Sequence, residues 1–146
     1  MRILFLLLLA YSLQAESFWN LTGLQKANIY VKNEVSYLEA KTVSDIKEKM
    51  KAVLKKNAIV TGQQDSPILI ISLEEISTDE SHYVYVKLAL GEEAQTYRED
   101  KSSTFAYTYV VTDFVELDAE ELDSGVLESA DFLLSQFSEH YEDDKE

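Results

Sequence analysis

The spacing of the apolar residues changes twice along this chain, and these changes constrain its fold more than any other feature. Between residues 42 and 56 the apolar residues recur every three or four positions, which is typical of an amphipathic helix. From residue 68 to residue 115 the period is mostly two, which indicates strands. After residue 122 the helical spacing returns and continues to Tyr141. We therefore expect helices and strands to form separate layers.

Turn residues between these segments predict the order of the elements. The helix at 42–56 opens at Thr42, and Asn57 is a suitable residue to end it. The expected strands lie at 27–31, 68–76, 83–90 and 104–115. The order β-α-β-β-β-α predicts an α+β two-layer sandwich. We expect a largely antiparallel sheet of four to five strands with both amphipathic helices on one face.

The first fifteen residues have the layout of a secretory signal peptide. Arg2 gives a positive start, residues 3–13 are mostly apolar, and Ala15 offers a small residue before a cleavage point. Eleven residues are too few to span a bilayer, which takes about 20. We therefore expect residues 1–15 to be a cleavable signal and no transmembrane segment to remain after cleavage. The expected location is the bacterial periplasm, with extracellular secretion as the alternative.

The rest of the chain is expected to form one domain, because 146 residues favour a single core. We place that domain at residues 16–141 and expect residues 142–146 to be an acidic disordered tail. The chain has no cysteine, so disulfides and thiolate metal sites are excluded and packing alone must stabilise the fold. Phe18 and Trp19, close to the expected start of the domain, either dock onto it or form a partner-binding tip.

The charge of the chain is strongly negative and unevenly distributed. The formal net charge is −14, and residues 112–146 contain 13 acidic residues against Lys145 alone. Such a field opposes binding to nucleic acid and to anionic membranes, and it favours partners with a basic surface. We therefore expect no nucleic-acid partner.

Side chains that could carry chemistry are few. The two histidines, His82 and His140, fall on different expected elements, and the acidic run from Asp113 to Asp123 lacks the pattern of a calcium-binding loop. The four glycines are isolated and cannot form a phosphate-binding loop. We expect no catalytic residue, no metal site and no cofactor, so the chain is predicted not to be an enzyme.

The exposed sheet face is a better candidate for function. If Val84, Val86 and Leu88 face the helices, then Tyr83 and Tyr85 face the opposite way. The same alternation turns Ile68 and Ile70 outward on the neighbouring strand. These four residues, Tyr83, Tyr85, Ile68 and Ile70, are the predicted partner-binding residues. Further along, Phe105, Tyr107, Tyr109 and Val111 alternate on one face, whose direction the sequence leaves open.

Three functions fit this sequence. The first is a non-enzymatic, exported interaction module that binds another envelope protein. The second is a soluble carrier for a small hydrophobic or aromatic ligand, held between sheet and helices by Phe105, Tyr107 and Phe132. The third is a small hydrolase-like enzyme that uses His82. The first is our expectation, the second needs a cavity, and the third needs His82 in a pocket with a carboxylate and a hydroxyl.

Overall fold

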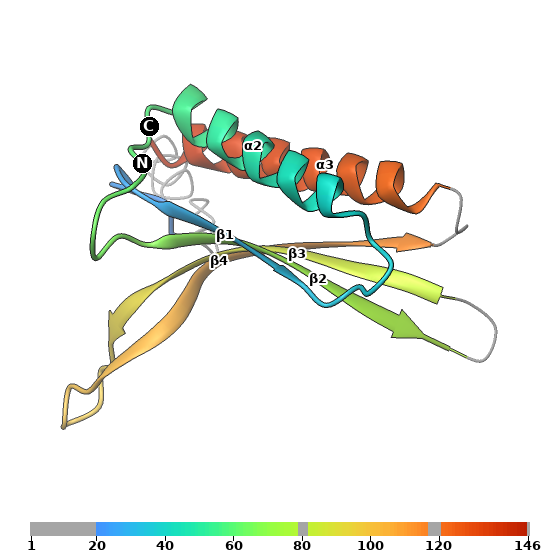
Figure 1. Ribbon diagram of the computed structural model, residues 1–146. Helices are drawn as coiled ribbons and strands as arrows, with labels where there is room; N and C mark the ends of the chain where they lie inside the picture. Colours follow the sequence, from blue (N-terminus) through green and yellow to red (C-terminus); the bar gives the residue numbers. More distant parts are fainter. Residues whose placement is uncertain (1–19, 79–81, 117–120, 146) are drawn as a thin grey trace, which may run out of the picture.

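In the part of the chain that the structure describes, the fold is a four-stranded mixed sheet covered by two helices on one face (Figure 1). The computed structural model describes residues 20–78, 82–116 and 121–145. The elements are β1 (Asn28–Asn33), α2 (Ala40–Lys56), β2 (Ile68–Ser77), β3 (His82–Gln95), β4 (Ser103–Glu116) and α3 (Leu122–Asp143). The expected α+β class, the order β-α-β-β-β-α and the packing of both helices against the sheet are confirmed. The expected signal at residues 1–15 lies outside the described residues.

The strands follow their order in the chain, β1-β2-β3-β4, across the sheet. β1 and β2 are parallel because α2 connects them, with Tyr30 opposite Ile70. The pairs β2–β3 and β3–β4 are antiparallel, and Leu69 lies opposite Leu90. The sheet is therefore largely antiparallel, with its single parallel pair at the β1 edge. β1 and β4 are the two edge strands of the described part of the chain.

The core lies between the helices and the inner face of the sheet. Leu69, Ile71 and Leu73 alternate along β2 and are fully buried, as are Val84, Val86 and Leu88 on β3. α2 contributes Ile46, Met50 and Leu54, and α3 contributes Val126, Ala130, Leu133 and Phe137. The buried residues recur every two positions in the strands and every three or four positions in the helices. For this reason the spacing of apolar residues in the sequence predicted the layers correctly.

The N-terminus of α2 is capped by the other helix. The sequence predicted a start at Thr42, whereas α2 begins at Ala40 and its N-cap residue, Glu39, makes no side-chain capping bond. Instead, Asp123 of α3 accepts hydrogen bonds from the Glu39 N–H and from the Thr42 hydroxyl. A carboxylate at a helix N-terminus binds otherwise unpaired N–H groups and interacts favourably with the helix dipole. Thr42 is therefore a buried residue that connects α2 to α3, and it is not the N-cap of α2.

The C-terminus of α3 differs from the expected disordered tail. The helix continues to Asp143, two residues beyond the expected domain end at 141, and Asp144 is its C-cap. Acidic residues interact unfavourably with a helix C-terminus. Here Asp144 has a compensating contact, because its Oδ2 accepts a 2.8 Å hydrogen bond from the N–H of Leu21. The last described turn of the chain is thus attached to the segment ahead of β1.

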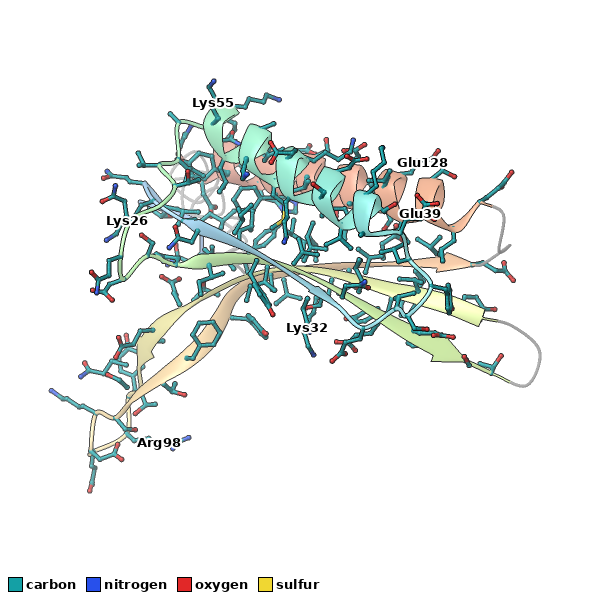
Figure 2. The ribbon with its side chains drawn as sticks, viewed as in Figure 1. Lys26, Lys32, Glu39, Lys55, Arg98 and Glu128 are labelled. Atoms are coloured by element: carbon teal, nitrogen blue, oxygen red, sulfur yellow. The ribbon has the colours of Figure 1, made fainter. Side chains whose placement is uncertain are left out.

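A β-bulge divides the β3–β4 hairpin into two parts. The register shifts between Leu90 and Gly91, so that Leu90 pairs with Tyr109 but Gly91 pairs with Tyr107, and Thr108 is the additional residue. Beyond the bulge the hairpin bends away from the helices (Figure 1). We call this part, residues 91–107, the hairpin arm. Its far end carries Arg98 and the fully exposed Tyr97 (Figure 2).

Candidate functional site

The sheet face opposite the helices is the candidate site, and we call it the open face. The pattern of burial assigns side chains to it, because the neighbours of each buried inner residue point the other way. In the described part of the chain, no helix lies on this side of the sheet (Figure 1). Its side chains include Tyr30, Lys32, Ile68, Ile70, Tyr83, Tyr85, Lys87, Ala89, Phe105, Tyr107, Val110, Thr112 and Phe114.

Strand register arranges these side chains in rows across the sheet. One row is apolar and runs from Tyr30 through Ile70 and Ala89 to Val110. A second row contains Tyr85 and Phe114, whose ring centroids are 5.0 Å apart. Tyr30 is 56% exposed and Phe114 is 60% exposed, so both edge strands present an aromatic ring to solvent. Exposed apolar rows of this kind are typical of a binding site.

The predicted partner-binding residues all lie on the open face. Ile68 and Ile70 on β2, and Tyr83 and Tyr85 on β3, are each half-buried. Ile70 and Tyr85 belong to the two rows, whereas Tyr83 lies at the far end of β3 opposite Ile76 and Glu116. The most exposed rings of this face belong to Tyr30, Phe105 and Phe114. Tyr30 and Phe114 were not predicted as site residues, and Phe105 was assigned to the alternative ligand site. Their period-2 spacing was visible in the sequence, but their position on edge strands was not.

A row of polar residues separates the two apolar rows. Lys32, Ser72, Lys87 and Thr112 are successive partners across the four strands. Lys32 projects from the side of the sheet away from the helices (Figure 2), and its Nζ lies 2.9 Å from Glu34. The hydrogen bond to Glu34 and the charge of that carboxylate raise the pKa of Lys32. The Nζ of Lys87 lies 5.5 Å from the ring centroid of Tyr107, a cation–π contact. The open face therefore has two cationic groups among its aromatic residues.

The hairpin arm extends the open face with two more rings. Phe105 and Tyr107 have centroids 5.9 Å apart in an edge-to-face arrangement. The Phe105 ring lies over Gly91, and a Cβ added at that glycine would come within 2.2 Å of the ring. A glycine at position 91 thus allows the ring of Phe105 to come close to the backbone of the neighbouring strand.

The alternative ligand site is not assembled as the sequence predicted. Phe105 and Tyr107 lie on the open face, whereas Phe132 is 53% exposed on the outer side of α3. Phe105 and Tyr107 therefore belong to the sheet layer and Phe132 to the helix layer. The three residues do not line one cavity between sheet and helices. The bulge is the physical reason, because it turns Phe105 and Tyr107 outward while Tyr109 and Val111 stay inward. Instead, Tyr109 packs 5.5 Å from Phe137, centroid to centroid.

Neither histidine is part of a described metal cluster. His82 is the first residue of β3, opposite Ser77, and its side chain lies outside the described ones. The Nδ1 of His140 lies 3.0 Å from the hydroxyl of Tyr109, in the inner layer. Over residues 20–78, 82–116 and 121–145, no three histidine, aspartate or glutamate side chains are grouped to hold a metal ion. None of the helices in these ranges has the length and apolar character needed to cross a bilayer.

Comparison with known proteins gives similarities to solved structures but none to sequences. No protein-family model and no curated protein sequence matches this chain. A minor lipoprotein from Acinetobacter baumannii, known from a 2.35 Å crystal structure, is similar over 80% of this chain and 91% of its own. The two are 12% identical, and the TM-score is 0.43. A likeness this distant does not extend to function.

Proposed function

We propose that this chain is an exported, non-enzymatic interaction module that binds another envelope protein through its open face. The observation that carries the proposal is the exposed aromatic and aliphatic surface on the side of the sheet opposite both helices. Aromatic residues dominate the energetics of protein interfaces, because each gives a large contact area at a low entropic cost. Export is inferred from the layout of residues 1–15.

The charges around the open face favour a particular kind of partner. By strand alternation, Glu74, Glu93 and Glu116 lie at its periphery, whereas Lys32 and Lys87 lie between its apolar rows. A complementary surface would place basic groups at its rim and an apolar patch with a carboxylate at its centre. The net charge of −14 would also accelerate association with a basic partner.

The test compares two phenylalanines of similar exposure on opposite layers. Phe114 lies on the open face, and Phe132 lies on the outer side of α3. Each is replaced in turn by a photo-crosslinking benzoylphenylalanine, and the cells are irradiated. We expect an adduct with an envelope protein from position 114 and not from position 132. Adducts of equal yield from both positions would refute binding through the open face.

The partner identified in this way allows a quantitative measurement. We expect Phe114→Ala to weaken binding by about 2 kcal/mol, or roughly thirtyfold in Kd, as truncation of an aromatic hot-spot residue does. Tyr83→Ala and Tyr85→Ala test the residues predicted from the sequence, and Phe132→Ala is the matched control, expected to leave Kd unchanged. Calorimetric titration measures the effect, and circular dichroism confirms that each variant is folded.

A further inference from the structure

A pocket lies at the base of the hairpin arm, beside the open face. Its volume is about 330 Å³, with residues 65–68 on one side and residues 91–93 and Phe105 on the other. A space of this size is large enough for a small ligand or for a side chain of another protein. Ile68 and Phe105 are open-face residues, so the pocket is continuous with that face.

Strand register brings the walls of this pocket together. Gly91 lies opposite Ile68 of β2, and Glu93 lies opposite Phe105 of β4. A side chain at position 91 would overlap the Phe105 ring, so the position requires glycine. The glycine and the bulge beside it therefore place an aromatic ring, a carboxylate and the loop ahead of β2 around one space.

The charge of the pocket is negative. Asp65, Glu92 and Glu93 line it, and neither a lysine nor an arginine does. Over residues 20–78, 82–116 and 121–145, none of these three carboxylates takes part in an ion pair. Glu92 accepts a 2.6 Å hydrogen bond from the hydroxyl of Thr108, whereas Asp65 and Glu93 keep their oxygens for a ligand. The pocket therefore favours a cation.

Two uncharged groups complete the wall of the pocket. The Phe105 side chain is more than half exposed, and an aromatic face attracts a cation that comes within about 6 Å of its centroid. The Oγ of Ser66 is buried, and it has no hydrogen-bond partner in the part of the chain that the structure describes. A buried hydroxyl without a partner is unfavourable. An N–H donor that reaches Ser66 from the pocket would supply the missing hydrogen bond.

This arrangement suits an organic cation better than a metal ion. Among the described residues, no three carboxylate or histidine side chains are grouped to hold a metal, whereas calcium takes about six to eight oxygens around one point. A guanidinium is larger and planar, stacks on aromatic rings and carries five N–H donors. An ammonium has three donors and is more strongly hydrated. Arginine is therefore the side chain that can use the ring, the hydroxyl and the carboxylates together.

We propose that this pocket binds the guanidinium of an arginine on the protein that covers the open face. The guanidinium stacks on Phe105, donates to the carboxylates of Asp65 and Glu93, and reaches the hydroxyl of Ser66 with a further N–H. The source of the arginine rests on the proposed function, whereas the recognition of its side chain rests on the pocket alone.

Two short peptides test this recognition without the partner. The full-length gene is expressed with ¹⁵N labelling, and the protein is purified in the form that the cell accumulates. It is titrated with acetyl-Gly-Arg-Gly-amide in about 150 mM NaCl, where diffuse attraction is screened. The amide signals of Ser66, Gly91 and Glu93 should shift and saturate, with a Kd on the order of 1 mM. The peptide with citrulline, which has nearly the same shape and no charge, should not saturate.

Substitutions assign the binding to individual groups of the pocket. Glu93→Gln, Phe105→Leu and Ser66→Ala should each weaken binding of the arginine peptide about threefold, the size expected of one charge, one ring or one hydrogen bond. Glu99→Gln removes the same charge at the exposed tip of the arm, and Phe114→Leu removes a similarly exposed ring elsewhere on the open face. Both controls should leave Kd unchanged. The NMR spectrum of each variant shows whether it is folded.

Three results would overturn the pocket as an arginine site. The citrulline peptide could bind as well as the arginine peptide, Glu99→Gln could weaken binding as much as Glu93→Gln, or the shifts could appear with millimolar calcium chloride and not with the peptide. Arginine-selective shifts without a crosslink from position 114 would uphold the pocket and refute its link to the open face. A crosslink without these shifts would refute the pocket and leave the proposed function standing.

Discussion

Tyr109 shows how one buried hydroxyl connects the sheet to α3. The ring is almost fully buried against Phe137, and its hydroxyl lies 3.0 Å from the Nδ1 of His140. Burial raises the pKa of Tyr109 well above its ordinary value of about 10, because the phenolate would lose its hydration. The neutral hydroxyl is therefore the form compatible with the fold.

This shift predicts a loss of stability in alkali. Above pH ~10 the unfolded chain releases the Tyr109 proton while the folded chain retains it, so the free energy of unfolding falls as pH rises, by up to about 1.4 kcal/mol per unit. Below pH ~10 the contribution is fully present. In urea titrations between pH 9 and 11, Tyr109→Phe should show a shallower decline than the unaltered protein. Tyr97→Phe, at a fully exposed position, should keep the original slope. Equal slopes for both variants would contradict the prediction.

Single residues also show where sequence reasoning reaches its limit. Alternation correctly assigned Tyr83, Tyr85, Ile68 and Ile70 to the face opposite Val84 and Val86, because a regular strand has a fixed period. The same alternation failed for Phe105 and Tyr107, because the extra residue at Thr108 reverses the faces beyond it. No turn residue or glycine in β4 marks this bulge. Thr42 has the sequence features of an N-cap, but its partner, Asp123, is 81 residues away along the chain.

At the scale of the elements, α2 and α3 are joined by contacts of very different strength. The side chain of Asn57, the C-cap of α2, is buried and donates to the carbonyl of Val53 and to the hydroxyl of Ser138 on α3. The ion pair between Lys49 and Asp131 is closer, at 2.7 Å, but both side chains are partly exposed. Exposed ion pairs stabilise little, because water screens them and both side chains lose freedom.

Stability measurements on two variants should rank these contacts. We expect Asn57→Ala to lower the free energy of unfolding by about 2 kcal/mol, since it leaves buried polar groups without their partner. Lys49→Ala should lower it by less than about 1 kcal/mol. Urea denaturation followed by circular dichroism gives both values. A larger effect for Lys49→Ala than for Asn57→Ala would show that charge pairing, and not the buried amide, connects the two helices.

The order and type of the elements were predictable because the apolar residues of each helix or strand keep the same spacing along its whole length. Their ends were less predictable, since ends depend on contacts with other elements. α3 extends to Asp143 because Asp144 binds the N–H of Leu21, a contact between the two ends of the described chain. The open face was predictable in part for the same reason. Alternation identifies outward residues, but only the strand order makes Tyr30 and Phe114 edge residues.

For the whole molecule, net charge is the dominant electrostatic property. The chain carries 27 acidic against 13 basic residues, and its acidic excess is concentrated in the last quarter, which includes α3. Like charges repel in the compact state and weaken it. Within the described part of the chain, lysines form ion pairs at Lys32, Lys41, Lys49, Lys51 and Lys145. These pairs offset only a small part of the acidic excess.

Stability should therefore increase with salt. Raising NaCl from about 10 to about 150 mM shortens the Debye length from roughly 30 to 8 Å and screens the repulsion, so the thermal midpoint should rise. Replacing the exposed residues Glu128, Glu139 and Asp143 by their amides should raise the midpoint at low salt and reduce its salt dependence. A midpoint that is constant or falls with added salt would show that repulsion among these carboxylates does not limit stability.

The hairpin arm has a practical consequence. Beyond the bulge at Leu90 and Gly91, the arm bends away from the helices, and its far end at residues 97–101 is exposed. Insertions are best tolerated at exposed loop tips that make few contacts with the core. A fluorescent label or an affinity epitope placed between Glu99 and Asp100 would therefore leave the packing of both layers intact. The tip of the arm is therefore a position at which the protein can be immobilised or labelled while most of the open face stays accessible.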